Sequence, residues 1–406
     1  MLSRAIFALR ASNFRAIVGA HCQQRVRVEG CGVSFRRVLL FCHLWAALIA
    51  SVFLLLLGVT GSFIVYEREI DRVVNRRLIE VRPTGHPLLL GELFSRLEKL
   101  HPGFKVTELA FSRRPDSAYE VYLDPGNGAE GSVVTVDQYT GSELGDAKTA
   151  STFVNSVHQF HTHLLMAKHR EAAKLIVGIA SIFLLFLSCS GIVLWWRRKL
   201  FRINWSGNGK RINFDLHNML GIVCSLFLFC FALTGIALTW DGAVSGLIDK
   251  VMPLGDMPRR PGLPEHADGE PVLGPDAIVA AAREALPGAE IDSLSMNPGM
   301  PADLRMKFPE DRTPIGRSRI WLDPFTGKAL SIWSTRAAPI GFRLSRMWIR
   351  EIHTGDVFGW PTRLLACVVS LVLPILTITG TLIWWNRSRK LVPDSVDVRG
   401  NLNSSW

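Results

Sequence analysis

The chain has 406 residues, of which 48% are hydrophobic, and its formal net charge is +11 at pH 7. The apolar residues are concentrated in four runs of about 20 residues or more, which excludes an ordinary water-soluble protein and indicates a polytopic membrane protein. The basic residues flank these runs and form no patch interleaved with aromatic side chains, so the charge does not indicate a nucleic-acid partner.

The N-terminal segment, residues 1–35, contains several arginines, one acidic residue and no long apolar run. This composition resembles that of a targeting presequence. We interpret the segment more simply as a basic cytoplasmic tail without fixed structure, or as the product of a translation start placed too far upstream.

Four transmembrane helices are predicted from the apolar runs. Each run is nearly free of charge and ends in Trp or Tyr, which are enriched at membrane–water boundaries. The predicted helices occupy residues 36–66, 175–196, 215–240 and 364–386. Membrane lipid is therefore an expected partner of this protein.

The orientation of the helices is predicted from the basic residues around them. Lys and Arg are concentrated just before the first helix, in the 197–214 loop and in the 387–406 tail. Positive residues in short loops mark the cytoplasmic side of a membrane. Both termini and the loop are therefore predicted to be cytoplasmic, and residues 67–174 and 241–363 to lie outside.

Each outer segment is predicted to be a small α+β module. Residues 91–104 (GELFSRLEKLHPGF) and 275–290 (PDAIVAAAREALPGAE) have helical periodicity and stop at Pro-Gly. Alternating strands such as AYEVYLD and RSRIWLD follow these helices. Neither segment contains cysteine, so no disulfide framework is expected to hold the modules together.

Three pairs of similar segments indicate that the chain contains two internal repeats. They are VDQYTGSELG (136–145) with LDPFTGKALS (322–331), FHTHLL (160–165) with IHTGDV (352–357), and SGIVLWWRRK (190–199) with TGTLIWWNRSRK (379–390). Each half crosses the membrane an even number of times, so the two repeats are expected to be parallel and related by an axis along the membrane normal.

With these motifs the sequence resembles the PepSY-associated transmembrane protein family. The resemblance covers residues 34–390 and rests on two β-modules that end in an Asp-x-x-Thr-Gly hairpin. Each module lies between a predicted helix that starts near a histidine and one that ends in Trp-Trp. It implies PepSY-like periplasmic modules in a multi-pass protein of the bacterial inner (plasma) membrane. The family is linked to iron uptake and includes di-haem reductases of ferric siderophores.

The first candidate ligands are His43 and His217, which lie near the start of the first and third predicted helices. Each is followed seventeen residues later by a Thr-Gly pair, at 60–61 and 234–235. A single histidine of this kind would be interpreted as an interfacial residue with its ring among the lipid headgroups. Because the repeat places both at one depth, we predict that they face each other and bind the iron of a b-type haem from both sides.

The second candidate pair is His161 and His353, which correspond by the repeat and precede the second and fourth helices. We predict that they bind a second b haem near the outer surface. His158 and His163 are rivals to His161. A bilayer core of about 30 Å separates the two levels, so each iron must be bound by histidines of one level.

Two further features have competing interpretations. The Thr-Gly and Ser-Gly pairs at 60–61, 190–191, 234–235 and 379–380 allow close helix packing or make room for a flat macrocycle, and we favour packing. Arg343, Arg346 and Arg350 lie close to His353 and would attract an anionic chelate or a haem propionate, although a solvated helix face is the simpler interpretation.

The expected function is therefore di-haem electron transfer that reduces a ferric siderophore, or another ferric chelate, outside the membrane. No nicotinamide or flavin domain is visible, so a separate electron donor is required, and no catalytic residue is assigned. One alternative is a non-enzymatic protein whose modules bind or regulate a partner protein such as a peptidase. A weaker alternative is a transporter, which the parallel repeats would suit. Against it, no helix interrupted by Pro recurs in the two halves, since Pro374 has no counterpart at the matching position of the first half.

Overall fold

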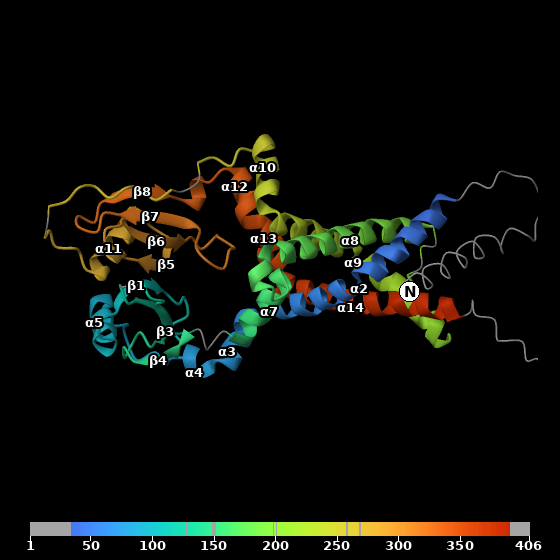
Figure 1. The fold of residues 1–406 in the computed structure, drawn as a ribbon, viewed down its shortest axis with the longest axis horizontal. Helices are drawn as coiled ribbons and strands as arrows, with labels where there is room; N and C mark the ends of the chain where they lie inside the picture. The colour runs from blue at the N-terminus through green and yellow to red at the C-terminus, as the bar shows by residue number, and fades with distance from the viewer. Residues whose placement is uncertain are drawn as a thin grey trace, which may run out of the picture. The chain divides into compact units, whose positions relative to one another are not determined.

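The computed structural model describes residues 34–126, 128–147, 152–197, 199, 201–256, 259–267 and 269–389. The segment 1–33 and most of the 387–406 tail, for which the sequence predicts cytoplasmic ends, lie outside these residues. The helices are α2 (Phe35–Ile64), α3 (Glu67–Val74), α4 (Arg76–Ile79), α5 (Leu90–Leu100), α7 (Thr152–His163), α8 (Arg170–Trp196), α9 (Gly209–Thr239), α10 (Asp241–Val251), α11 (Pro275–Ala285), α12 (Ile340–Arg343), α13 (Ile349–Thr354) and α14 (Trp360–Ser388) (Figure 1). The strands are β1 (Lys105–Ala110), β2 (Tyr119–Asp124), β3 (Ser132–Val136), β4 (Glu143–Asp146), β5 (Glu290–Ser295), β6 (Ala302–Lys307), β7 (Ser318–Leu322) and β8 (Ala329–Trp333).

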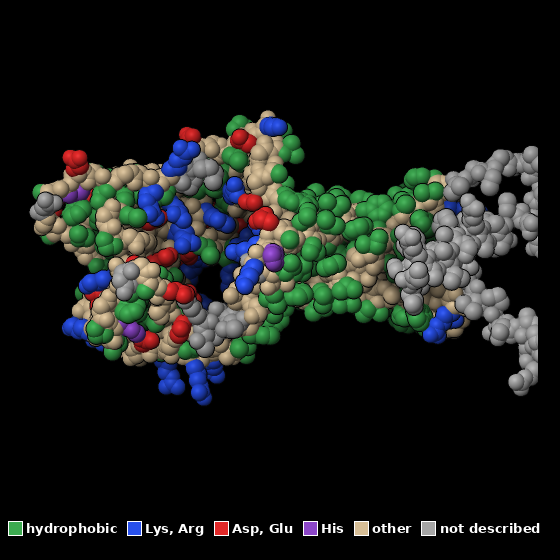
Figure 2. Space-filling view, in the orientation of Figure 1, with side chains coloured by type: hydrophobic (Ala, Val, Ile, Leu, Met, Phe, Trp, Pro, Cys, Tyr) green, Lys and Arg blue, Asp and Glu red, His purple; other side chains and the backbone are tan. Residues whose placement is uncertain are grey.

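Four helices, α2, α8, α9 and α14, are long and apolar enough to cross a membrane, with mean hydropathies of 2.3 to 2.5. Only 17–28% of the residues in their most apolar windows are buried within the chain. The remaining apolar side chains cover the outside of the helices (Figure 2). Such a surface is stable in lipid and not in water, so the chain is a membrane protein.

The core of the helical bundle is formed by small and branched side chains from all four helices. They are Ala50, Leu54, Ala180, Leu184, Cys224, Leu228, Ala232, Val369, Val372 and Leu373. Glycine allows the closest approach between α2 and α14: Gly58 lies directly against the ring of Pro374. Such contacts between small residues are the usual way in which helices associate in lipid.

We expect Gly58→Ala to destabilise this bundle. The added Cβ would lie 2.6 Å from Pro374 Cδ and 2.9 Å from the carbonyl oxygen of Ser370, so α2 and α14 would have to move apart. Overpacking of this kind costs about 1–3 kcal/mol. The midpoint of thermal unfolding in detergent measures the effect.

Gly221→Ala is the matched control, because its added Cβ would meet only Leu376 Cδ2, at 3.9 Å. Its midpoint should stay unchanged or rise, since alanine favours a helix more than glycine does. If Gly58→Ala were as stable as Gly221→Ala, this contact between α2 and α14 would be absent.

The strands of the two predicted modules form one sheet of eight, in the order β4-β3-β2-β1-β5-β6-β7-β8. The halves join where β1 pairs antiparallel with β5, from Glu108 opposite Ser295 to Ala110 opposite Ser293. Helices α5 and α11 contribute to a shared core with the sheet. The sequence predicts two separate modules, and the pairing of β1 with β5 makes them a continuous structure.

A side chain of the second half also caps a helix of the first. The Asp276 carboxylate, in α11, accepts hydrogen bonds from the backbone N–H groups of Leu90 and Gly91, both at 2.8 Å. These amides belong to the first turn of α5, where they have no partner within the helix. A negative charge there is also favoured by the helix dipole.

The two Asp-x-x-Thr-Gly segments adopt the same turn. Asp137 Oδ1 accepts a hydrogen bond at 2.8 Å from the backbone N–H two residues further on, and Asp323 Oδ1 does so at 2.9 Å. Gly141 and Gly327 both have φ of 72°, a left-handed conformation that glycine adopts without strain. The similarity of these sequences therefore corresponds to equal local geometry.

Candidate functional site

The four candidate histidines lie on four different helices. His43 is in α2 and His217 in α9, whereas His161 is near the end of α7 and His353 is in α13. Along α2 and α9, the seventeen residues from the histidine to the following Thr-Gly pair correspond to a rise of about 26 Å. The Thr-Gly pairs contact His161 and His353, so the histidines form two levels separated by most of the hydrocarbon thickness of a bilayer. We call the level at the helix ends that lead to the sheet the outer level, and the level at the opposite ends the inner level.

Every one of these histidines is hydrogen-bonded through Nδ1 to a hydroxyl of a spanning helix. The distances are 2.7 Å for His43 and Ser190, 2.9 Å for His217 and Thr379, 2.9 Å for His161 and Thr60, and 2.8 Å for His353 and Thr234. Each hydroxyl also donates its hydrogen to the carbonyl four residues earlier in its own helix, at 2.6–2.8 Å.

These bonds determine the tautomer of all four rings. A hydroxyl has one hydrogen, and here it is already donated, so each hydroxyl must accept from the histidine Nδ1–H. A neutral imidazole bound in this way carries its lone pair on Nε2. This is the form in which histidine binds a metal, and a hydrogen bond at the other nitrogen orients the ring for it.

The glycine that follows each hydroxyl makes room for the imidazole. A Cβ at Gly61 would lie 3.1 Å from His161 Cε1, and one at Gly380 would lie 3.1 Å from His217 Cε1. The corresponding separations from His43 and His353 are 3.6 Å at Gly191 and Gly235. We call each Ser/Thr-Gly pair with its bound ring a cradle. The sequence favours helix packing for these pairs, and the structure gives them this additional role.

In each half, every cradle holds a histidine that comes from another segment of the same half. In the first half, α2 places His43 in the cradle of α8, and α2 itself holds His161 from the segment before α8. In the second half, α9 and α14 exchange His217 and His353 in the same way. Each half therefore contains one inner and one outer histidine, held by the same chemistry.

The outer histidines face each other across a cavity of about 340 Å³. The ring centroids of His161 and His353 are 6.5 Å apart, and their planes are inclined by 58°. Two imidazoles bound to one metal ion through bonds of about 2 Å would have centroids about 6 Å apart. The observed separation therefore fits two axial ligands of one iron.

The cavity is apolar inside the bundle and charged at its outer edge. Leu54, Leu57, Leu184, Leu228, Phe231 and Leu373 line the inner part. Glu67, Arg68, Lys174, Arg350, Asp356 and Arg363 line the outer part. Haem has a large apolar ring and two carboxylates on one edge, so both parts of the cavity suit it.

Burial keeps the outer histidines neutral. It lowers the pKa of His161 to about 3, and the neighbouring His353 acts in the same direction. Burial likewise lowers the pKa of His353 to about 4. Both rings are therefore unprotonated at Nε2 throughout the physiological pH range.

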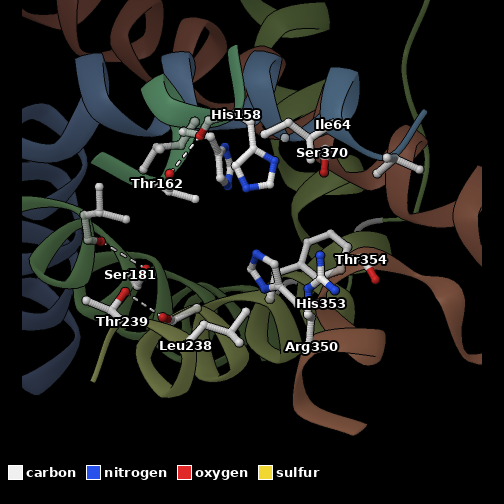
Figure 3. Close-up of a pocket in the computed structure, with 18 of the residues that line it drawn as sticks. Ile64, His158, Thr162, Ser181, Leu238, Thr239, Arg350, His353, Thr354 and Ser370 are labelled. Carbon is white, nitrogen blue, oxygen red and sulfur yellow. Dashed lines mark hydrogen bonds between the residues drawn. The ribbon is translucent and has the colours of Figure 1, made fainter. Parts of the chain in front are cut away.

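The two rival histidines also line the cavity but are bonded differently. His158 Nδ1 lies 2.8 Å from Glu67 Oε2, and His163 Nδ1 lies 2.7 Å from the hydroxyl of its neighbour Thr162. Figure 3 shows the rings of His158 and His353 on opposite sides of the cavity. Among these three histidines of α7, His161 is the one held in a cradle.

The inner histidines, His43 and His217, are close enough to interact electrostatically. Their cradles lie near the ends of α8 and α14, beside the Trp-Trp pairs. In the described parts of the chain, no group of three or more His, Cys, Asp or Glu side chains is placed to hold a metal ion. Paired histidines suit a metal whose other ligands come from a macrocycle.

A family model described as PepSY-associated TM region matches residues 40–387, a range that includes all four histidines and their cradles. No curated protein matches the chain.

Proposed function

The chain belongs to the PepSY-associated transmembrane family, and from that premise we propose that it is a di-haem electron-transfer protein that reduces a ferric chelate. The chelate is a ferric siderophore or a similar complex. The protein lies in a bacterial inner membrane with both termini in the cytoplasm, and the PepSY-like modules, parallel repeats of one unit, lie in the periplasm. The basic residues at the inner ends of the helices support this orientation.

One observation carries the proposal: four histidines, in two pairs at two levels, have Nδ1 bound to a hydroxyl, and their Nε2 atoms form no hydrogen bond with the described residues. A buried imidazole placed only to stabilise helix packing would satisfy both nitrogens or expose one to water. Here both histidines of the outer pair line a cavity whose inner part is apolar. Axial ligation of b-type haem uses this arrangement on both faces of the iron.

The residues of this chain would each have a defined task. His43 and His217 would hold the inner haem, and His161 and His353 the outer haem. The cradle hydroxyls would orient the rings, and the apolar side chains between the levels would exclude water. The chemistry that bound haem would supply is one-electron transfer, from a separate reduced donor on the cytoplasmic side to the Fe(III) of the chelate, which becomes Fe(II). Fe(II) binds hard oxygen ligands more weakly, so iron would be released.

The alternative role as a partner-binding protein would use the sheet and leave the paired histidines without a purpose. A transporter would not need four neutral imidazoles with equal hydrogen bonds. We therefore prefer electron transfer over both.

The visible spectrum tests the proposal. Protein purified in mild detergent from haem-replete cells should show a Soret band when oxidised and an α-band after reduction with dithionite, with two haems per chain. Addition of a ferric chelate to the dithionite-reduced protein, after removal of excess reductant, should abolish the α-band. A preparation without these bands would refute the cytochrome assignment.

A further inference from the structure

Four basic side chains near the outer cavity have no partner within the described chain. They are Arg68 in α3, Arg350 in α13, Lys307 in β6 and Arg317 next to β7. None of them forms a side-chain hydrogen bond or lies within ion-pair distance of a carboxylate in the described residues. Arg346, by contrast, pairs with Asp241 at 3.0 Å, and Arg343 donates to backbone carbonyls.

Two of these four cations belong to short helices next to the bundle, and the other two lie in or next to strands of the sheet. Nevertheless each one affects the pKa of at least one other or is affected by it. Burial lowers the pKa of Arg68, and Arg350 acts in the same direction. Burial also lowers the pKa of Arg317, followed by the effect of Arg350. For Lys307 the pKa is lowered by burial, then by Arg113, and also by Arg68. The positive groups therefore lie close enough to act on one another electrostatically.

Arg68 and Arg350 connect these cations to the histidine cavity, because both line its wall together with His161 and His353. Figure 3 shows Arg350 next to His353. Figure 2 shows Lys and Arg side chains gathered around a hollow between the sheet and the helices.

Several carboxylates nearby are engaged with other groups. The exception is the buried Glu351, which has one carboxylate oxygen without a partner in the described residues and whose pKa is raised by burial to about 7. Glu67 binds His158 at 2.8 Å, and Asp356 accepts from the Thr354 hydroxyl at 2.7 Å. Glu69 binds Arg363, and Asp292 binds Arg113. Asp356 and Glu67 also act on Arg68, Asp292 and Asp311 act on Lys307, and Glu351 acts on Arg317, but no described carboxylate lies within ion-pair distance of the four cations. Holding like charges together costs free energy, and a bound anion removes that cost.

We propose that Arg68, Arg350, Arg317 and Lys307 form an anion-binding vestibule that docks ferric complexes whose ligands are ionised catecholates or carboxylates. This inference rests on the proposed function and specifies the charge of its substrate. Guanidinium groups donate paired hydrogen bonds to such oxygen ligands, and basic walls concentrate anions before they dock. Lys307 lies in β6 and Arg317 next to β7, and neither lines the histidine cavity, so the vestibule extends beyond that cavity.

Gallium complexes test docking without electron transfer, because Ga(III) resembles Fe(III) in size and charge and is not reduced. We would measure the binding of a trianionic gallium tris-catecholate and of a cationic gallium trihydroxamate to the purified full-length protein by calorimetry. The anionic complex should bind at least about 10-fold more tightly, and the difference should shrink as salt is added. Equal affinity for the two complexes would overturn the proposal.

The variant Arg317→Gln with Lys307→Gln should weaken binding of the anionic complex by about 10-fold or more and leave the haem spectrum unchanged. Its matched control is Arg283→Gln with Lys328→Gln, which removes the same net charge from two exposed cations of the second half and should have little effect. An equal loss in both variants would mean that only the overall charge matters and would refute the vestibule.

Arg68→Gln and Arg350→Gln distinguish docking from haem binding. Weaker binding of the gallium complex with both haems retained supports the vestibule. Loss of the outer haem with unchanged gallium binding would assign these arginines to the propionates and overturn the proposal. Tight anionic binding to a protein that proved free of haem would refute the proposed function and leave the vestibule supported.

Discussion

His353→Ala is expected to remove the outer haem from the purified protein and to leave the inner haem in place. The remaining ligand, His161, cannot hold the iron on both faces, and the inner pair lies about 26 Å away along the helices. The absorbance of the reduced α-band should fall by about half, because one of two haems is lost. His161→Ala should give the same spectrum, whereas His43→Ala and His217→Ala should remove the other haem.

The rival histidines provide the controls for this experiment. His163→Ala should retain both haems, since this ring is bonded to its neighbour Thr162 and not to a cradle. His158→Ala should also retain them. If His158→Ala abolished the outer haem and His161→Ala did not, the ligand assignment in α7 would have to be exchanged. Loss of both haems from every folded variant would refute the pairing by level.

Thr379→Val is expected to weaken binding of the inner haem by about 10–100-fold, the usual effect of removing a group that orients a metal-binding histidine. Valine has a similar shape but cannot accept the Nδ1–H of His217, which lies 2.9 Å from the Thr379 hydroxyl. The ring loses its orientation and becomes a poorer electron donor to the iron. A weaker donor stabilises Fe(III) less, so the midpoint potential of the inner haem should rise in a potentiometric titration.

Thr381→Val is the matched control, because Thr381 lies in the same helix and donates to its own i−4 carbonyl at 2.8 Å without contacting a histidine. It should not change the potential, and Thr379→Ser should restore it by returning the hydroxyl. If Thr379→Val and Thr381→Val had equal effects, the hydroxyl of Thr379 would serve the helix alone.

The hydropathy pattern alone was sufficient to predict the four spanning helices, because bilayer thickness sets a length that few other structures require. The turns of the two Asp-x-x-Thr-Gly segments were predictable for a similar reason. Asp137 and Gly141 satisfy a local backbone geometry that needs no distant contact. Equal spacing from His43 and His217 to their Thr-Gly pairs also indicated that the two histidines lie at one depth.

The partners of those histidines could not be read from the sequence. Ser190 lies 147 residues from His43, and Thr379 lies 162 residues from His217. Only the packing of α2 against α8, and of α9 against α14, brings each ring to its cradle. The second role of a Thr-Gly pair also depends on these distant contacts. In the sequence the pair resembles an ordinary packing motif, but in the structure its hydroxyl accepts a hydrogen bond from a histidine Nδ1 and so determines the tautomer of that ring.

The sequence by itself therefore determined what depends on local geometry and on distance along the chain: membrane spans, turns, and histidines at two depths. Tertiary structure decided what depends on contacts between distant segments. The pairing of β1 with β5, the four cradles and the cations that Arg68 and Lys307 bring together are all of this kind. Hydrophobic periodicity describes which face of an element is buried, but it does not specify which other element covers that face.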